Sequence, residues 1–482
     1  MSSLKKQAAS GARWTTASTV TSTALNFLRL AILARLLSPQ DFGLMAMIMV
    51  VIGFAQAYAD MGISNAIIYR QDATRDQLSS LYWLNIIAGV AVFIIVLAAN
   101  PLIVAFYKEP RLASLLPWAA LVYLVTPIGQ QFQILLQKNL LFRPLAIIEM
   151  ISAICGLITA VGFALAGAGV FSLILGQLAD SGIRALSLAG IGLGKWRPRI
   201  RFNRSDLQGY LGFGFYQMGE RSISYLNSNL DKLLIGSLLG AQALGYYSVA
   251  WNLAIQPVVR INPIITKVAF PIFAKVQRDV ETLRKGYLSV LKMLSSINFP
   301  LLVGMAATAP VFIAVVFGQE WLPAVFLLRV LAFVALLRSM GNPVGSLLLA
   351  KGRADLAFKW NVMLFVTQLP GVYLGVKLGG MPGVALALIG LQICYFYPSY
   401  RILVQPLINC TLRDYLTSMS RAFIYSLIMG GAIIIVPHMI TFEAGILFAG
   451  QVMEGALLYF ILMCVFDRRY IIEMSSLFFK GI

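Results

Sequence analysis

Charged residues are scarce in this sequence. Only 12% of the 482 residues are Asp, Glu, Lys or Arg, whereas 59% are hydrophobic. An average soluble protein has about 25% charged residues and about 45 to 50% apolar residues. A composition this poor in charge excludes a soluble globular enzyme and predicts a membrane protein.

The residues that usually build catalytic and metal sites are also few. Histidine occurs once, as His438 at the end of a hydrophobic stretch, so we interpret it as an interfacial residue and not as the base of a catalytic triad. The sequence also lacks a phosphate-binding GxxxxGK[ST] loop. The four cysteines lie far apart without a CxxC spacing, which predicts packing residues; they are Cys155, Cys394, Cys410 and Cys464. We therefore expect no enzyme, no cofactor and no metal site.

Acidic residues are half as frequent as basic ones. The 38 Lys and Arg against 19 Asp and Glu give a formal net charge of +19, but no polar, lysine-rich domain of the kind that binds nucleic acid is present. Membrane proteins concentrate Lys and Arg in their cytoplasmic loops. The excess of positive charge is therefore expected to reflect membrane orientation.

Apolar stretches long enough to cross a bilayer recur along the whole chain. A hydrocarbon core of about 30 Å needs about 20 helical residues. We expect the first stretch to remain as a membrane helix and not to be a cleaved signal peptide, because Arg29 and Arg35 interrupt it and no small-residue cleavage site follows. We predict fourteen spans, at residues 14–37, 42–69, 80–100, 114–136, 145–166, 170–190, 209–238, 243–268, 286–316, 322–349, 357–378, 382–405, 417–437 and 443–465.

The connections between these spans differ sharply in charge. With the N-terminus placed in the cytoplasm, the connections on that side carry 23 Lys and Arg, and those on the opposite side carry only Lys108, Arg111 and Lys377. The positive-inside rule then predicts that both termini are cytoplasmic.

An internal repeat predicts two lobes. Residues 34–43 align with residues 236–245 at an offset of 202, with four identities that include Gly43 and Gly245, and Asn85 aligns with Asn298 at an offset of 213. Each copy has an even number of spans, so both copies have the same orientation. We predict an all-α protein with two pseudo-symmetric six-helix lobes. Its parts are an N-lobe at 1–190, a basic cytoplasmic linker at 191–208, a C-lobe at 209–405, and two further helices with a cytoplasmic tail at 406–482.

Basic residues inside the spans are the first candidates for a binding site, because burying charge in hydrocarbon is costly. A two-lobe plan predicts a central cleft bordered by the first, second, seventh and eighth spans, which opens alternately to each side. Arginine suits phosphate because its planar fork makes bidentate contacts and keeps its charge when desolvated. We expect Arg29, Arg35, Arg221 and Arg338 to bind a pyrophosphate group in this cleft.

Acidic residues inside the spans are candidates for ion coupling. We name Asp60, Asp231 and Asp180 for this role, since burial and a nearby cation shift a carboxyl pKa in opposite directions. Asp231 is the repeat equivalent of Arg29. A structural pair or a side chain that reaches the interface is the alternative for every intramembrane charge, and we prefer it for three groups. These are Glu149, Arg260 and the Asp180 to Arg184 pair, whose i, i+4 spacing suits an ion pair within one helix.

Several motifs give the chain a family resemblance. They are residues 33–43 (LARLLSPQDFG), 60–68 (DMGISNAII), 81–85 (LYWLN), 129–132 (GQQF), 262–265 (NPII) and 338–346 (RSMGNPVGS). With these motifs, and over nearly its whole length, the chain resembles the polysaccharide flippases of the multidrug/oligosaccharidyl-lipid/polysaccharide exporter superfamily, and above all the colanic-acid-type exporters of bacterial inner membranes.

The resemblance implies a function. Such a protein exports undecaprenyl-pyrophosphate-linked oligosaccharide repeat units to the outer leaflet, where another protein polymerises them. The superfamily also includes proteins that flip a lipid-linked peptidoglycan precursor through an arginine-bearing cleft, and Arg29 and Arg35 occupy comparable places in the first span. The implied partners are the lipid-linked oligosaccharide, membrane lipids and polysaccharide polymerase or export machinery, without nucleic acid.

Two other classes stay open at this point. An ion-coupled multidrug or small-molecule antiporter of the same superfamily shares the architecture. A membrane glycosyl polymerase or ligase is disfavoured because its acceptor chemistry needs a sizeable outer loop, and the predicted outer loops are short. Without a nucleotide-binding loop, the energy for transport is expected from an ion gradient, the membrane potential or consumption of the product.

Overall fold

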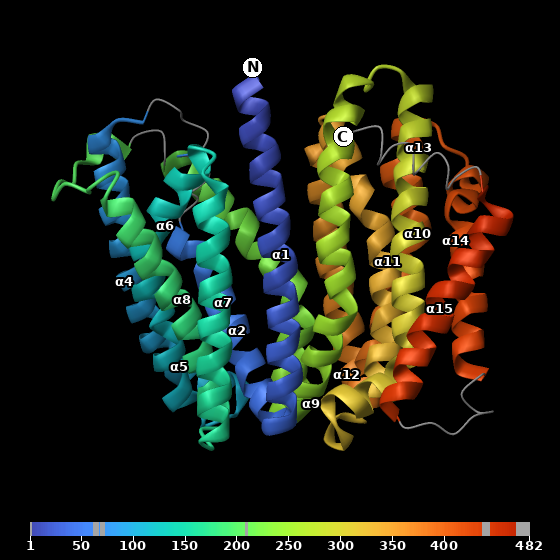
Figure 1. Cartoon of the computed structure of the whole chain (residues 1–482), viewed down its shortest axis with the longest axis horizontal. Coiled ribbons are helices and arrows are strands. Elements are labelled where there is room, and N and C mark those ends of the chain that lie inside the picture. Colours follow the sequence, from blue (N-terminus) through green and yellow to red (C-terminus); the bar gives the residue numbers. More distant parts are fainter. Residues whose placement is uncertain (1, 61–66, 68–72, 208–210, 436–443, 469–482) are drawn as a thin grey trace. The chain divides into compact units, whose positions relative to one another are not determined.

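The computed structural model describes residues 2–60, 67, 73–207, 211–435 and 444–468. Within these residues the regular structure is helical and no strand occurs, so the all-α prediction is confirmed for the described part of the chain (Figure 1). His438 lies outside the described residues. Two compact units divide the chain, the first Met1–Gly245 and the second Tyr246–Ile482.

The first unit is a bundle of long helices. One short 3-10 helix, η1 (Arg204–Leu207), precedes α9, the helix that continues into the second unit. In chain order the helices are α1 (Ser2–Leu36), α2 (Pro39–Asp60), α4 (Arg75–Tyr107), α5 (Leu112–Ala120), α6 (Val122–Lys138), α7 (Phe142–Leu165), α8 (Val170–Leu193) and the first part of α9 (Leu211–Lys275).

The second unit continues from α9 with the same kind of long apolar helix. Its helices are α10 (Val280–Phe312), η2 (Ile313–Phe317), η3 (Gln319–Trp321), α11 (Ala324–Ala350), α12 (Ala354–Ser399), η4 (Tyr400–Val404), α13 (Gln405–Ile408), α14 (Leu412–Ile435) and α15 (Ala444–Phe466). The elements η2 and η4 are single turns of π-helix.

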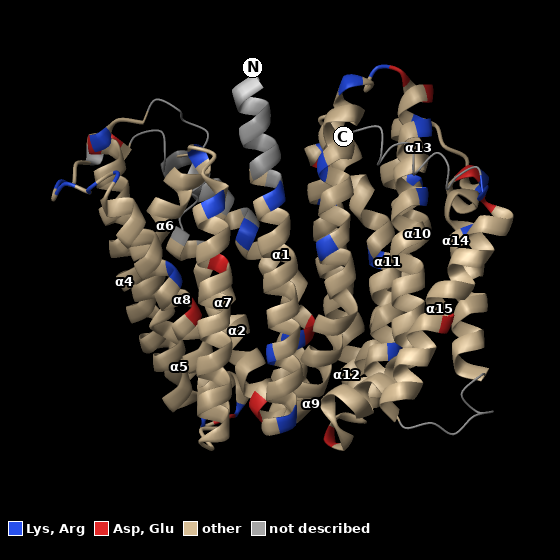
Figure 2. Ribbon diagram, in the orientation of Figure 1, with Lys and Arg blue, Asp and Glu red and all other residues tan. Residues whose placement is uncertain are grey.

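Eleven segments of the described residues are long and apolar enough to span a membrane. Two of them, at Arg221–Lys275 and Ala354–Ile408, have 55 residues each and contain a glycine with non-helical dihedral angles, Gly240 or Gly380. The helix α8 covers the predicted sixth span but is not among the eleven. In each unit most Lys, Arg, Asp and Glu lie toward the helix ends, and few interrupt the middle of a helix (Figure 2).

The two aligned repeat segments, residues 34–43 and 236–245, contact each other within the first unit. A Cβ atom on Gly43 would lie 1.6 Å from the carbonyl oxygen of Ala241, and one on Gly245 would lie 1.8 Å from that of Pro39. Gly43 and Gly245 are equivalent in the repeat, and so are Pro39 and Ala241, so the two contacts are related by the same offset of 202. Only glycine allows backbones to approach this closely.

The first part of α9 packs with the first unit, although it begins the predicted C-lobe. The Tyr225 hydroxyl donates to the Met49 carbonyl at 3.0 Å, and the Ser222 hydroxyl donates to the Tyr58 hydroxyl at 3.0 Å. The boundary between compact units therefore follows Gly245, whereas the sequence repeat begins a new copy near residue 209. Packing and repeat divide the chain differently because tight contacts at Gly43 and Tyr225 cross the boundary of the repeat.

A buried acid fastens the last two helices to the second unit. Asp467, at the end of α15, accepts from Arg421 of α14 at 2.8 Å and from Lys292 of α10 at 3.4 Å, and its side chain is 9% exposed. The Tyr459 hydroxyl donates to the Ser296 carbonyl at 3.0 Å and adds a second link between α15 and α10.

Asp467→Asn is expected to lower the free energy of unfolding of the second unit by about 1 to 3 kcal/mol, because Arg421 and Lys292 both lose the Asp467 carboxylate. The loss is moderate because Arg421 is half-exposed and water replaces part of the interaction. Thermal unfolding of the purified protein in detergent measures this loss. The control is Asp355→Asn, whose carboxylate is 49% exposed beside Arg353 and is expected to change stability by less than about 1 kcal/mol. Equal effects from the two substitutions would contradict the role assigned to Asp467.

Candidate functional site

The described part of the first unit brings Arg29 and Asp180 into electrostatic contact. Arg29 lies half-buried on α1, seven residues before the end of that helix, and the Asp180 carboxylate on α8 attracts its guanidinium. Asp180 also lies 3.9 Å from Arg184, which confirms the ion pair predicted from their spacing. The Oδ1 atom of Asp180 is buried and accepts no hydrogen bond from the described residues. One carboxylate therefore serves two arginines from two helices.

Small residues place Asp180 close to its neighbours. On α7, a Cβ atom added to Gly156 would lie 2.9 Å from the carbonyl oxygen of Gly176 and 2.9 Å from Cβ of Asp180. On α8, a Cβ atom added to Gly176 would likewise lie too close to Cβ of Ala160 on α7. This close approach of α7 and α8 holds the acid inside the bundle.

A polar pocket opens beside this group, among α1, α6, α7 and α8. Its cavity volume is about 150 Å³, and Glu149 and Arg184 both line it. Other polar side chains on its wall are Thr15, Ser18, Gln133 and Gln137. From the sequence, a structural role was preferred for Glu149 and Arg184. In the structure both side chains line a cavity inside the first unit.

The remaining predicted residues of the first unit lie on α1, α2 and α9. Arg35 is exposed at the end of α1, and Arg221 is half-buried on α9. Asp231 is 2% exposed, and its carboxylate accepts from the backbone N–H of Lys232 at 2.9 Å. Asp60 is the last residue of α2, and its side chain lies outside the described residues.

Arg338 belongs to the second unit, where it lies against aromatic rings. Its guanidinium is 4.8 Å from the centroid of the Trp251 ring, and Trp251 stacks parallel to Tyr247 at 6.4 Å. The Tyr395 hydroxyl, which also interacts electrostatically with Arg338, shares a hydrogen bond of 2.6 Å with Thr367. A cation–π contact orients the arginine without neutralising it.

Sequence reasoning missed a polar stripe on α9. Asn252, Gln256 and Arg260 follow one another at intervals of four residues, and all three are exposed on the second unit. Their common spacing on an otherwise apolar helix is the signal that identifies such a stripe. Arg260 had been assigned a structural role, but its side chain projects from the unit beside two other polar groups.

Buried asparagines form a second feature that sequence reasoning did not assign. Asn298 donates to Asn262 at 2.7 Å, and Asn262 donates to the Ser339 carbonyl at 3.3 Å. Asn85, the repeat equivalent of Asn298, is equally buried, but neither of its polar side-chain atoms has a hydrogen-bond partner in the described residues. The repeat has therefore kept the buried amide in both copies but not the hydrogen bonds around it.

Comparison with known proteins identifies the family. A family model described as polysaccharide biosynthesis protein matches residues 32–326, more than half of the chain. The chain belongs to this family. Two relatives extend the match to most or all of the chain. It is 37% identical to the teichuronic acid biosynthesis protein TuaB of Bacillus subtilis (strain 168), over 100% of this chain and 99% of TuaB. It is 36% identical to the lipopolysaccharide biosynthesis protein WzxC of Escherichia coli (strain K12), over 88% of this chain and 86% of WzxC.

The polysaccharide biosynthesis protein also shares its fold with a solved membrane transporter. The lipid II flippase MurJ, in an inward closed conformation, matches with a TM-score of 0.77 over 95% of this chain and 99% of MurJ, at 17% identity. This identity is low, so the match establishes the fold. The resemblance to polysaccharide-exporting proteins drawn from the sequence motifs is confirmed at the level of the family.

Proposed function

We propose that this polysaccharide biosynthesis protein is a flippase. It moves undecaprenyl-pyrophosphate-linked oligosaccharide repeat units across the bacterial inner membrane for export of polysaccharide, by alternating access of its two lobes. Similarity over 100% and 88% of the chain to proteins of teichuronic acid and lipopolysaccharide biosynthesis supports a polysaccharide precursor as cargo. The shared fold with a lipid II flippase supports a lipid-linked one.

The observation that carries the proposal is the distribution of polarity among the helices. Of the eleven candidate spans in the described residues, those that contain α1, α2 and α9 are the least hydrophobic. These helices bear Arg29, Arg35, Arg221 and Arg260. Arginines kept on the least apolar helices fit a water-filled path for an anionic head group, and pyrophosphate is the anion that polyprenyl-linked sugars provide.

The proposed topology has fourteen crossings with both termini in the cytoplasm. Division of the two 55-residue segments at Gly240 and Gly380 raises the eleven candidate spans to thirteen, and α8 makes the fourteenth. The lower hydrophobicity of α8 is consistent with the Asp180 to Arg184 pair that it carries. The excess of Lys and Arg on one set of connections supports the orientation.

The mechanism that we propose makes and breaks no covalent bond. The pyrophosphate and sugars enter the polar path from the cytoplasm, the polyprenyl tail stays in lipid, and the change of access releases the head group on the other side. Asp180 is the preferred coupling group, because one of its oxygens is buried without a hydrogen bond among the described residues and two arginines share its charge. A coupling cation bound at Asp180 would compete with Arg29 for the carboxylate and release Arg29 to bind the substrate phosphate.

Deletion of the gene tests this function. We expect complete repeat units to accumulate on the polyprenyl carrier and surface polymer to disappear, since synthesis continues while translocation stops. Mass spectrometry of extracted polyprenyl-linked sugars measures the accumulation and identifies the cargo, and the wild-type gene in trans is the control. Normal polymer with normal lipid pools would contradict the proposal and favour a small-molecule antiporter.

A further inference from the structure

The basic segment between α8 and α9, residues 195–207, is an ordered strap. Its ends are anchored by apolar side chains, since Trp196 packs edge-on against Tyr82 and Phe132 and Leu207 is 4% exposed among Ile67, Leu78, Leu81 and Ile134. A run of charged residues of this kind is usually a solvated loop. This one is fixed along the flank of the first unit, where the strap projects beside α4 (Figure 1).

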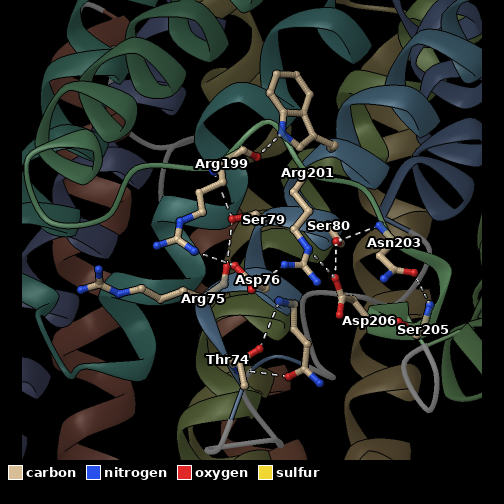
Figure 3. A network of polar contacts seen from close by, with 12 residues as sticks. Thr74, Arg75, Asp76, Ser79, Ser80, Arg199, Arg201, Asn203, Ser205 and Asp206 are labelled. Atoms are coloured by element: carbon tan, nitrogen blue, oxygen red, sulfur yellow. Dashed lines mark hydrogen bonds and ion pairs between the residues drawn. The ribbon is translucent and has the colours of Figure 1, made fainter.

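Polar contacts hold the middle of the strap to the first turns of α4 (Figure 3). Arg199 and Arg201 both bind the Asp76 carboxylate, at 3.2 and 2.9 Å. The Ser79 hydroxyl accepts from the Arg199 backbone N–H at 3.1 Å, and the Ser80 hydroxyl accepts from that of Asn203 at 3.2 Å. Further contacts in the network are Ser80 to Asp206 at 2.8 Å and Trp83 to the Arg199 carbonyl at 2.8 Å.

Two apolar residues of the strap are exposed where the chain bends between its two contacts with Asp76. The Arg201 backbone N–H donates to the Arg199 carbonyl at 2.8 Å, so Ile200 is the middle residue of a tight turn. Ile200 is 96% exposed and Phe202 is 48% exposed. Lys195 and Arg197 are exposed at the start of the same strap. Ile200 and Phe202 therefore form a small apolar tip beside two exposed basic residues, on a segment that many contacts hold in place.

The depth of the strap matches the interface of a bilayer. The 33 residues of α4 span about 50 Å at about 1.5 Å per residue, longer than a hydrocarbon core of about 30 Å. The strap lies alongside residues 76–83, the first two turns of α4, which places it at the level of the lipid head groups. Trp83 and Trp196 at its base are residues that favour this level.

We propose that the strap is an interfacial membrane anchor that binds anionic phospholipids. Ile200 and Phe202 enter the boundary between head groups and acyl chains, and Lys195 and Arg197 bind lipid phosphates. Basic residues beside an apolar tip complement a negatively charged leaflet, which favours lipid over a protein partner. The anchor is independent of the transported cargo, so the experiment below does not depend on flippase activity.

Fluorescence at a single cysteine tests the proposal in full-length protein. The four native cysteines are replaced by alanine, and Ile200→Cys carries an environment-sensitive nitrobenzoxadiazole label in nanodiscs of phosphatidylcholine with or without phosphatidylglycerol. We expect shorter-wavelength emission and protection from iodide, both stronger with phosphatidylglycerol. The matched control is Lys285→Cys, at a side chain that is 72% exposed in a salt bridge with Glu281, and its label is expected to remain in water.

A second variant separates the contribution of the basic side chains to lipid binding from that of the apolar side chains. Lys195→Gln combined with Arg197→Gln is expected to abolish the extra protection in phosphatidylglycerol. Thermal stability should fall only slightly, since both side chains are exposed and the Arg197 side chain makes a single contact of 3.4 Å with the Leu193 carbonyl. A label at position 200 that is as accessible to iodide as the one at 285 in both lipids would overturn the anchor. Protection that appears only in native membrane vesicles, and not in nanodiscs, would overturn the lipid assignment and favour a protein partner.

Discussion

Simultaneous Arg29→Ala and Arg35→Ala substitution is expected to lower translocation of the lipid-linked oligosaccharide by at least about 100-fold. Hydrogen bonds to charged groups are each worth about 1.5 to 3 kcal/mol, and every tenfold change corresponds to about 1.4 kcal/mol. Arg29 is half-buried on α1, one of the least hydrophobic helices, so the proposed contact of its guanidinium with phosphate would face little competition from water. The appearance of labelled substrate on the outer face of right-side-out vesicles measures the loss.

Two control substitutions define the role of these arginines. Arg111→Ala removes an equal charge from an exposed loop, where Arg111 binds Glu109 at 2.9 Å, and is expected to leave translocation unchanged. Arg29→Lys keeps the charge but loses the bidentate fork, so an intermediate rate is expected. Folding should persist in the double variant, because Asp180 retains Arg184 at 3.9 Å. Wild-type translocation by a folded double variant would refute the assignment of the two arginines.

Gly43→Ala is expected to prevent the first unit from folding, or to lower its unfolding temperature sharply. The new methyl group would lie 1.6 Å from the Ala241 carbonyl oxygen, and the neighbouring atoms are backbone, so the two helices must separate. Overpacking a core with flexible side chains already costs about 1 to 3 kcal/mol, and a rigid backbone cannot adapt as side chains do. Gly245→Ala is expected to have the same effect, since its methyl group would lie 1.8 Å from the Pro39 carbonyl oxygen.

The yield of monodisperse protein and its thermal unfolding in detergent measure both glycine variants. Gly190→Ala on α8 is the control, because a Cβ atom there meets nothing within 4 Å. Alanine favours a helix over glycine by about 0.5 to 1 kcal/mol, so this variant should be as stable as the wild type or slightly more so. A Gly43→Ala protein that unfolds at the wild-type temperature would show that the helices do not cross at these glycines.

The internal repeat does not predict which residue Arg29 contacts. Sequence equivalence relates Arg29 to Asp231, but equivalent residues share a position in their own copies and do not thereby meet. In the structure the acid that attracts Arg29 is Asp180 on α8. By contrast, the pairing of Asp180 with Arg184 was predictable. Side chains four residues apart are neighbours on the same face of a helix, whatever packs around that helix.

The strap shows a similar limit. The sequence predicts a basic cytoplasmic connection at residues 191–208, but nothing in its composition predicts that Ser79, Ser80 and Asp76 on a distant helix bind it. These contacts decide that Ile200 points outward. Exposure of Arg260 was also undecided, since a helical stripe has a direction only after the helix has packed.

The sequence by itself determined that this protein prefers lipid to water, that it is helical, and which family it belongs to. Composition sets the preference for lipid over water, and hydrophobic segments in lipid must become helices because they have to satisfy their own backbone hydrogen bonds. The repeat and the motifs were readable for the same reason, since they depend only on order along the chain. Tertiary structure alone decided which residues of different helices meet, because contacts such as Arg29 with Asp180 or Gly43 with Ala241 depend on the rotation and crossing of helices that are distant in sequence.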